Sequence, residues 1–267
     1  IPIIDGIRET LLAFRHLAEN RDFRQRPASS RSHETLDPAL LSRCRQAIAK
    51  HPAATIGEHD ALALLADFSF PVVRSERVNS RDELAAVAAS IGYPLVLKTA
   101  QANIDHKSDS QGVFINIADE AELVKHYDDL NARLGPAALL SPMIVDGIEL
   151  AFGTVNDPQF GPIIMVAAGG ILVEMLDDRS IAMCPVDRPR AEQMVASLKI
   201  SRLLDGMRGK PAVDRQPLVE AIVALSQIAY QLRDSIAEID VNPVIVNSTQ
   251  TLAVDALILP LKAAPKC

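Results

Sequence analysis

The feature that most constrains the fold is a pair of apolar segments near the C-terminus, residues 236–246 and 251–259, separated by four polar residues. Two apolar runs joined by a short polar turn predict an antiparallel hairpin. If Val246 pairs with Thr251, the numbers of every two paired residues sum to 497. The turn length therefore predicts which side chains meet across the two strands.

Three oxygen-bearing side chains interrupt this apolar hairpin. In the predicted register Asn242 lies opposite Asp255, and Asp240 lies on the same face, one side-chain repeat further along. Amide and carboxylate oxygens, completed by water and substrate phosphates, suit Mg²⁺. In the alternative interpretation, Asn242 begins a turn with Pro243 and Asp255 ends a strand. The cost of burying an unpaired carboxylate favours Asn242 and Asp255 as metal ligands.

A second candidate residue is Lys98, which ends the apolar segment 94–98 and precedes a polar loop at residues 104–112. A lysine at the end of a strand is ordinarily a solvated terminus. His106 is the one histidine of the loop, and a lone loop histidine is ordinarily a surface residue. A polar loop beside a lysine also suits a cover over phosphates, which lysine binds as a point charge.

A glycine pair, Gly169 and Gly170, interrupts a third apolar segment at residues 164–173. Glycines within a strand mark a bulge or the close approach of a backbone to a ligand. A glycine-kinked core strand explains the pair equally well, and both interpretations stay open.

Strands and helices alternate along the chain without a GxGxxG or Walker A sequence. The pattern predicts an α+β or α/β enzyme outside the Rossmann and P-loop classes. Helices are expected at residues 7–17, 39–49, 58–68, 80–91, 119–134, 190–198 and after Asp214. Strands are expected at residues 1–4, 71–74, 94–98, 112–117, 137–145, 149–155, 162–167, around 181, and in the two hairpin segments.

The composition argues against a nucleic-acid or membrane partner. The formal net charge is -7, from 34 acidic and 27 basic residues, and both partners favour a basic surface. The longest apolar run, residues 163–173, is too short to span a bilayer. Three distant cysteines predict a reduced, cytoplasmic protein without a disulfide framework. Because the chain begins at Ile1 and lacks a signal peptide, it is interpreted as a piece of a longer protein.

Seven segments, in order along residues 54–260, resemble the ATP-grasp domain of NDP-forming acyl-CoA synthetases, relatives of the succinyl-CoA synthetase β chain. They are residues 92–98, 105–109 with 112–113, 147–150, 157–162, 169–174, 203–209, and 238–243 with 254–255. The resemblance implies an ATP-grasp fold of two subdomains, residues 46–138 and 139–262, that hold a nucleotide between them. Residues 1–20 resemble the tail of a CoA-ligase domain, and residues 21–45 would link it to the rest.

The resemblance also implies roles for single residues. Lys98 would contact the nucleotide phosphates, and Asn242 and Asp255 match the family's Mg²⁺ ligands. Asp240 matches an acidic residue beside the travelling phosphate, and His106 matches a histidine that receives phosphate. The remaining nucleotide-binding residues implied are Ser141 and Met143 on the adenine strand, Glu149 near the ribose, and Gly169 and Gly170.

The implied reaction converts an acid, ATP and CoA into acyl-CoA, ADP and phosphate through phosphohistidine and acyl phosphate. ATP and Mg²⁺ would bind here, and CoA mainly to CoA-binding and CoA-ligase domains of the same or a partner chain, in an oligomer. The acyl group and the choice of ATP over GTP stay open.

Two other hypotheses stay open as well. A degenerate module that binds nucleotide without transferring phosphate is favoured by Gln111, in place of a usual glycine, and by Pro142 at the adenine hinge. A carboxylate–amine ligase shares the acyl-phosphate chemistry, but the His106 loop and the ligase-like N-terminus disfavour it. The retained Lys98 and metal residues favour an active synthetase domain.

Overall fold

The computed structural model describes residues 5–25, 36–51, 55–101, 110–170, 177–206 and 211–261. The chain divides into two compact units, Ile1–Glu34 and Thr35–Cys267. The first unit contains helix α1 (Ile7–Gln25), which confirms the predicted helix. The strand expected at residues 1–4 lies outside the described residues. Within the described part, no helix is both long and apolar enough to cross a membrane.

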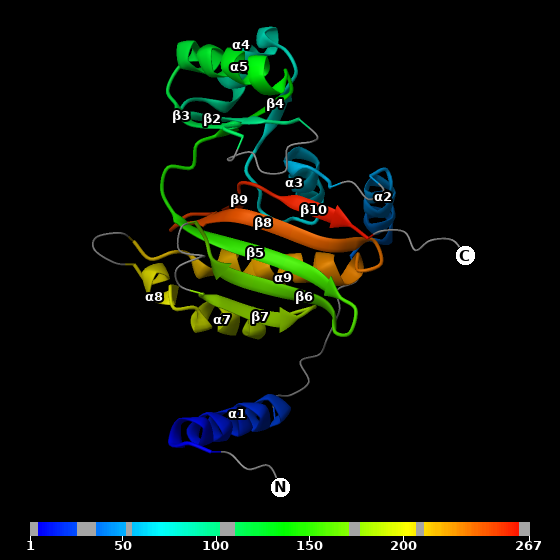
Figure 1. Cartoon of the computed structure of the whole chain (residues 1–267), viewed down its shortest axis with the longest axis vertical. Coiled ribbons are helices and arrows are strands. Elements are labelled where there is room, and N and C mark those ends of the chain that lie inside the picture. Colours follow the sequence, from blue (N-terminus) through cyan, green and yellow to red (C-terminus); the bar gives the residue numbers. More distant parts are fainter. Residues whose placement is uncertain are drawn as a thin grey trace. The chain divides into compact units, whose positions relative to one another are not determined.

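The second unit contains a small antiparallel sheet in the strand order β1-β4-β2-β3 (Figure 1). Its strands are β1 (Glu76–Val78), β2 (Leu95–Thr99), β3 (Val113–Ile117) and β4 (Ala138–Pro142). A short 3₁₀ turn (Arg81–Glu83) leads into α4 (Leu84–Ile91), and α5 (Glu120–Leu134) follows β3. These helices cover one face of the sheet, with Leu95, Leu97 and Tyr127 in a core between them.

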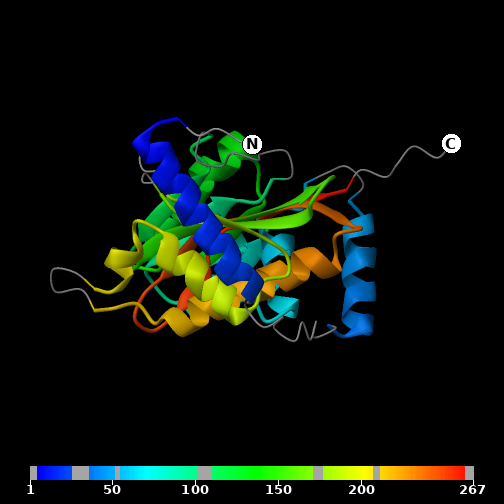
Figure 2. The ribbon, with the colours of Figure 1, turned by 90° about the horizontal axis from the view of Figure 1, so that it is seen from below.

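The same unit contains a larger antiparallel sheet in the order β10-β8-β5-β6-β7, with β9 also paired to β8. Its strands are β5 (Ile148–Asp157), β6 (Gly161–Ala168), β7 (Arg179–Met183), β8 (Ile236–Val246), β9 (Thr251–Ala253) and β10 (Leu257–Pro260). The helices are α2 (Pro38–Ala49), α3 (Glu58–Asp67), α7 (Arg188–Ser197), α8 (Ser201–Leu204) and α9 (Arg215–Gln231). Helix α9 packs against α7, β5, β6 and β8, as Figure 1 and the view from below in Figure 2 show.

Aspartates begin several helices by capping the first turn. The side chain of Asp119 accepts a hydrogen bond from the N–H of Glu122, and Asp214 does the same for Gln216. Such caps satisfy backbone donors that the helix itself leaves unpaired. The helix starts predicted at these two aspartates are confirmed.

The structure decides the fold class and corrects two strands. All pairings between named strands are antiparallel, so the fold is α+β. Residues 71–74 are not a strand: Val72 forms only an isolated bridge with Ala253, and β1 begins at Glu76. The strand expected at residues 251–259 is two strands, because β9 ends at Ala253 and β10 begins at Leu257, opposite the irregular part of β8.

Helical structure occupies both ends of the segment predicted as a linker, residues 21–45. Helix α1 continues to Gln25, and α2 begins at Pro38. Leu41 and Cys44 of α2 are buried in the core of the large sheet. Residues 26–35, between the two helices, lie outside the described part of the chain.

Candidate functional site

Lys98 is a buried cation at the end of β2. Its Nζ donates hydrogen bonds to Oε1 of Glu58 at 2.8 Å and to the carbonyl oxygen of Val254 at 2.9 Å. The same nitrogen lies 3.7 Å from Oδ2 of Asp255. Because the residue is only 6% exposed, it is not the solvated strand terminus of the alternative interpretation.

Lys98 lies on the face of the small sheet that turns away from α4 and α5. It pairs with Leu139 of β4, and Val96 pairs with Ser141 two residues along. These four side chains alternate with those of the small-sheet core, yet all are buried. A polar group on this covered face therefore needs a partner within the protein.

The register predicted for the C-terminal hairpin is confirmed. Val246 pairs with Thr251, and Asp240 pairs with Leu257 on the far side of the break, so the sum of 497 holds in β9 and, up to Leu259, in β10. Between them, the N–H of Asn242 donates to the carbonyl oxygen of Asp255 at 3.2 Å. The two predicted metal ligands are therefore neighbours across the hairpin.

A β-bulge turns β8 at this point. Residues 242 and 243 together oppose the single residue Ala151, because the pairing with β5 shifts between Leu150 and Phe152. Bulges re-aim side chains and are frequent beside active sites. The bulge thus shifts the alternation of buried side chains, from Ile239 and Val241 before it to Val244 and Val246 after it, directly beside Asn242.

Asp240 lies in a group of carboxylates on the exposed face of β8. Glu238, Asp240 and Asn242 project from this face and alternate with buried apolar residues. Partial burial, followed by the negative charges of Glu238 and Asp255, raises the pKa of the Asp240 carboxyl above its ordinary value. Carboxylates that disfavour one another's charge form a site that a cation stabilises.

The residues present fit Mg²⁺ bound together with a phosphate ligand. Within the described part of the chain, no three His, Cys, Asp or Glu side chains form a metal cluster. Mg²⁺ does not need one, because it commonly takes one or two carboxylates and completes its shell with water and substrate phosphates. The amide oxygen of Asn242 and the carboxylate of Asp255 supply such a partial set.

The predicted adenine strand is β4 and the residues after it. The side chain of Ser141 is buried. The N–H of Met143 donates to the carbonyl oxygen of Pro94 at 2.9 Å. One backbone donor of the expected adenine site therefore already has an acceptor within the protein.

Gly169 and Gly170 both lie against Glu149 of β5. The N–H of Gly169 donates to the carbonyl oxygen of Glu149 at 2.7 Å, and a Cβ on Gly169 would lie 2.6 Å from the carbonyl carbon of Glu149. Gly170 has a φ of 60°, and a Cβ there would lie 2.5 Å from Oε2 of Glu149. Close approach to a neighbouring strand thus explains the glycine pair, which fits around Glu149.

Gln111, which replaces a usual glycine of the resembled family, has a φ of 50°. This left-handed conformation is one that glycine adopts without cost and that other residues adopt rarely. The backbone at this position therefore has a glycine-like conformation despite the substitution. The preceding loop, including His106, lies outside the described residues.

Glu58 is the site residue that the sequence analysis missed. It is 4% exposed and stands in the first turn of α3. An acidic residue in the first turn of a helix is expected for its favourable interaction with the helix dipole. Nothing in the sequence pattern distinguished it from such a residue.

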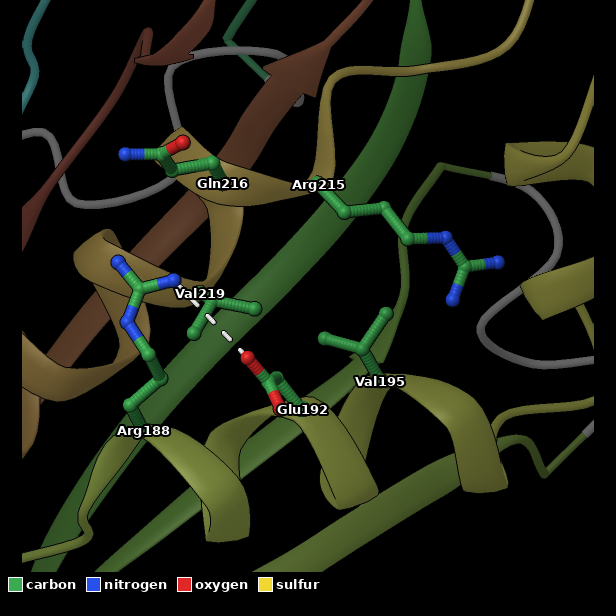
Figure 3. Close-up of a pocket in the computed structure, with 6 residues that line it drawn as sticks. All are labelled: Arg188, Glu192, Val195, Arg215, Gln216 and Val219. Carbon is green, nitrogen blue, oxygen red and sulfur yellow. Dashed lines mark ion pairs between the residues drawn. The ribbon is translucent and has the colours of Figure 1, made fainter.

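A pocket of about 280 Å³ lies elsewhere, between α7 and α9 (Figure 3). It is lined by Arg188, Glu192, Val195, Arg215, Gln216 and Val219. Arg188 pairs with Glu220 at 2.8 Å, and Arg215 pairs with Asp205 at 2.7 Å. Helix α9 packs on the face of the large sheet opposite to Asp240. The pocket contains none of the predicted site residues, and ion pairs account for its arginines.

Comparison with protein families identifies the fold. Residues 47–259 match the family described as "ATP-grasp domain". The chain belongs to the ATP-grasp family. The ATP-grasp fold expected from the sequence is thereby confirmed, and the match covers every described candidate residue.

This ATP-grasp chain is similar to subunits and segments of CoA ligases. It is 34% identical over 212 residues to subunit beta of the ADP-forming acetate–CoA ligase II of Pyrococcus furiosus. That match covers 76% of this chain and 90% of the subunit. The chain is 35% identical over 207 residues to the ADP-forming 4-hydroxybutyrate–CoA ligase of Nitrosopumilus maritimus. That match covers 74% of this chain but only 30% of the relative, so the chain spans less than a third of the longer enzyme.

The ATP-grasp chain also resembles solved structures of dinucleotide forming acetyl-coenzyme A synthetase 1 from Ca. Korarchaeum cryptofilum. The complex of that protein with coenzyme A, Ca-AMPCP and HgCl⁺ gives a TM-score of 0.76 at 31% identity, covering 81% of this chain and 97% of the other. A second complex contains coenzyme A and Mg-AMPPCP, with a phosphohistidine segment pointing towards the nucleotide binding site. It gives a TM-score of 0.72 at 31% identity, covering 84% of this chain and 99% of the other.

Proposed function

We propose that this chain is the nucleotide-binding, phosphoryl-transfer part of an ADP-forming acyl-CoA synthetase. The complete enzyme would convert an acid, ATP and CoA into acyl-CoA, ADP and phosphate. One observation carries the proposal: the Lys98 ammonium group lies 3.7 Å from the carboxylate of Asp255. Asp255 is in turn the neighbour of Asn242 across the hairpin. Enzymes that bind a nucleoside triphosphate place a lysine and a Mg²⁺ site together around its phosphates.

In this proposal some residues bind the phosphates and others bind the metal. Lys98 neutralises phosphate charge, and Asn242 and Asp255 hold Mg²⁺. The bound ion would supply positive charge that offsets the negative charge of the phosphates during transfer. Asp240 lies beside the travelling phosphoryl group. His106 accepts that group as its bond to ADP breaks, and the phosphohistidine then supplies phosphate for the acyl phosphate.

The rest of the nucleotide would be held by both sheets. Ser141 and Met143 of the small sheet lie along adenine, and Glu149 of the large sheet lies near the ribose. The glycine pair supports the place of Glu149, because a Cβ at Gly170 would meet the Glu149 carboxylate and a Cβ at Gly169 would meet the backbone of Glu149. The Korarchaeum structure with Mg-AMPPCP, at 31% identity, supports a nucleotide with Mg²⁺ in this fold.

CoA-binding and CoA-ligase domains, in the same or a partner chain, are the proposed partners. The longer relative, of which this chain spans 30%, supports this, as does the relative whose name is "subunit beta". In α1, Ile7, Leu11, Phe14 and Leu17 are each at least 65% exposed. A continuous exposed apolar stripe marks a protein contact, and the proposal assigns it to the tail of a CoA-ligase domain. An oligomer in the cytoplasm is part of the same proposal.

Transfer of labelled phosphate tests the function. Incubation of the chain with Mg²⁺ and ATP labelled at the γ-phosphate should yield protein-bound phosphate that is stable in alkali and labile in acid. His106→Ala should abolish the label, whereas the matched control His126→Ala, on α5, should keep it. Nucleotide binding without any label would favour the degenerate binding module. Label retained in His106→Ala would contradict the assigned acceptor.

A further inference from the structure

We propose that Glu58 is a positioning residue that holds the Lys98 ammonium group at the phosphate site and ties the small sheet to the large one there. The inference rests on the proposed function, because it takes Lys98 as the phosphate contact. Glu58 makes the shortest contact of that ammonium group, at 2.8 Å. The family resemblance implies no role for Glu58.

The ion pair between Glu58 and Lys98 is almost wholly buried. The two side chains are 2% and 8% exposed. A buried charge is costly unless it is paired and hydrogen-bonded, and a pair that loses one member leaves the other uncompensated. Removal of Glu58 would therefore leave the Lys98 ammonium without its hydrogen-bonded carboxylate and free to move toward Asp255, the remaining carboxylate at 3.7 Å.

The geometry leaves part of the ammonium group for a ligand. An ammonium group has three donors, and two are directed at Glu58 and at the carbonyl oxygen of Val254. The distance of 3.7 Å to Asp255 is too long for a hydrogen bond. Two hydrogen bonds thus leave one donor of the ammonium group for a phosphate oxygen, with the proposed metal ligand 3.7 Å from the nitrogen.

Lys98 and its two hydrogen-bond acceptors come from different parts of the unit, each with its own core. Leu95 and Leu97 of β2 belong to the core of the small sheet, whereas Leu62 and Leu65 of α3 belong to the core of the large sheet. Both hydrogen-bond acceptors of the Lys98 ammonium lie in the large-sheet part. The side chain therefore joins the two parts at the place where the nucleotide is proposed to bind.

Glu58 is itself held firmly in the large-sheet part. Just before α3, the N–H of Ile56 donates to the carbonyl oxygen of Ile258 at 2.8 Å, and the N–H of Ile258 donates back at 3.2 Å. Ile258 belongs to β10, three residues after Asp255. The same backbone bridge thus fixes Glu58 beside the segment that carries the proposed metal ligand.

Titration of the full chain with ATP and with AMP, in Mg²⁺, tests the role of Glu58. Glu58→Ala should weaken ATP binding at least about tenfold, the loss expected for a misplaced charge-assisted hydrogen bond. It should change AMP binding less than about twofold, because AMP lacks the β- and γ-phosphates. Glu58→Gln keeps an acceptor without the charge and should give a smaller loss for ATP only. Glu220→Gln, which breaks an exposed ion pair of equal length, should change neither.

Each other result contradicts the inference. Equal losses for ATP and AMP in both Glu58 variants would assign the residue a general structural role. Unchanged ATP binding in Glu58→Ala would show that Lys98 does not need it. If Glu58→Ala fails to fold, the nearly isosteric Glu58→Gln decides by the same comparison. A wild-type chain that binds no ATP would contradict the proposed function and the inference together.

Discussion

Lys98→Met is expected to reduce ATP binding at least about 100-fold and to lower the free energy of unfolding by about 3–5 kcal/mol. Methionine keeps the length of the side chain but removes the charge at the phosphate site. It also leaves the buried carboxylate of Glu58 without the ammonium group that lies 2.8 Å away. Isothermal titration measures the first effect, and urea unfolding measures the second.

Two further variants separate binding from stability. The double variant Lys98→Met with Glu58→Leu should recover much of the lost stability, because replacing both members of a buried pair by apolar residues is far milder than removing one. It should not recover ATP binding. Lys125→Met, on the exposed surface of α5, should change neither quantity. ATP binding unchanged in Lys98→Met would exclude this lysine from the nucleotide site.

Asp255→Asn is expected to remove the dependence of ATP binding on Mg²⁺. In the wild type, Mg²⁺ should strengthen ATP binding at least about tenfold, and in the variant less than about twofold, because Mg²⁺ strongly prefers carboxylate to amide oxygens. Without Mg²⁺ the variant should bind ATP at least as well as the wild type, because it removes a negative charge near the phosphates. Titrations with and without Mg²⁺ measure both effects.

The matched control for Asp255 is Asp128→Asn, in an exposed ion pair with Arg81. It should leave the Mg²⁺ dependence of binding unchanged. Full Mg²⁺ dependence retained in Asp255→Asn would contradict the assignment of this carboxylate to the metal and shift it to Asp240, a neighbouring carboxylate of the hairpin.

The local part of the site could be predicted from the sequence because it depends on short-range rules. A four-residue turn fixed the register that places Asn242 opposite Asp255, and that register is confirmed. The aspartates at residues 119 and 214 marked two helix starts through their capping chemistry. Each of these features is decided within about fifteen residues of sequence.

The missed features depend on contacts between distant segments. Glu58 gained its place from Lys98, forty residues along the chain, and nothing near it in sequence indicates that partner. The break at residues 254–256 allows the carbonyl oxygen of Val254 to accept from the same ammonium group, whereas the apolar pattern alone predicts a continuous strand. The glycine pair likewise has its reason in Glu149, which belongs to another strand.

The most direct test of the central claim is isothermal titration of the wild-type chain with ATP, with and without Mg²⁺. The account predicts saturable binding of one ATP per chain that strengthens at least about tenfold with Mg²⁺, as expected for a phosphate site completed by a cation. Binding that is the same with and without Mg²⁺, or no binding in either condition, would contradict a working phosphoryl-transfer site in this chain.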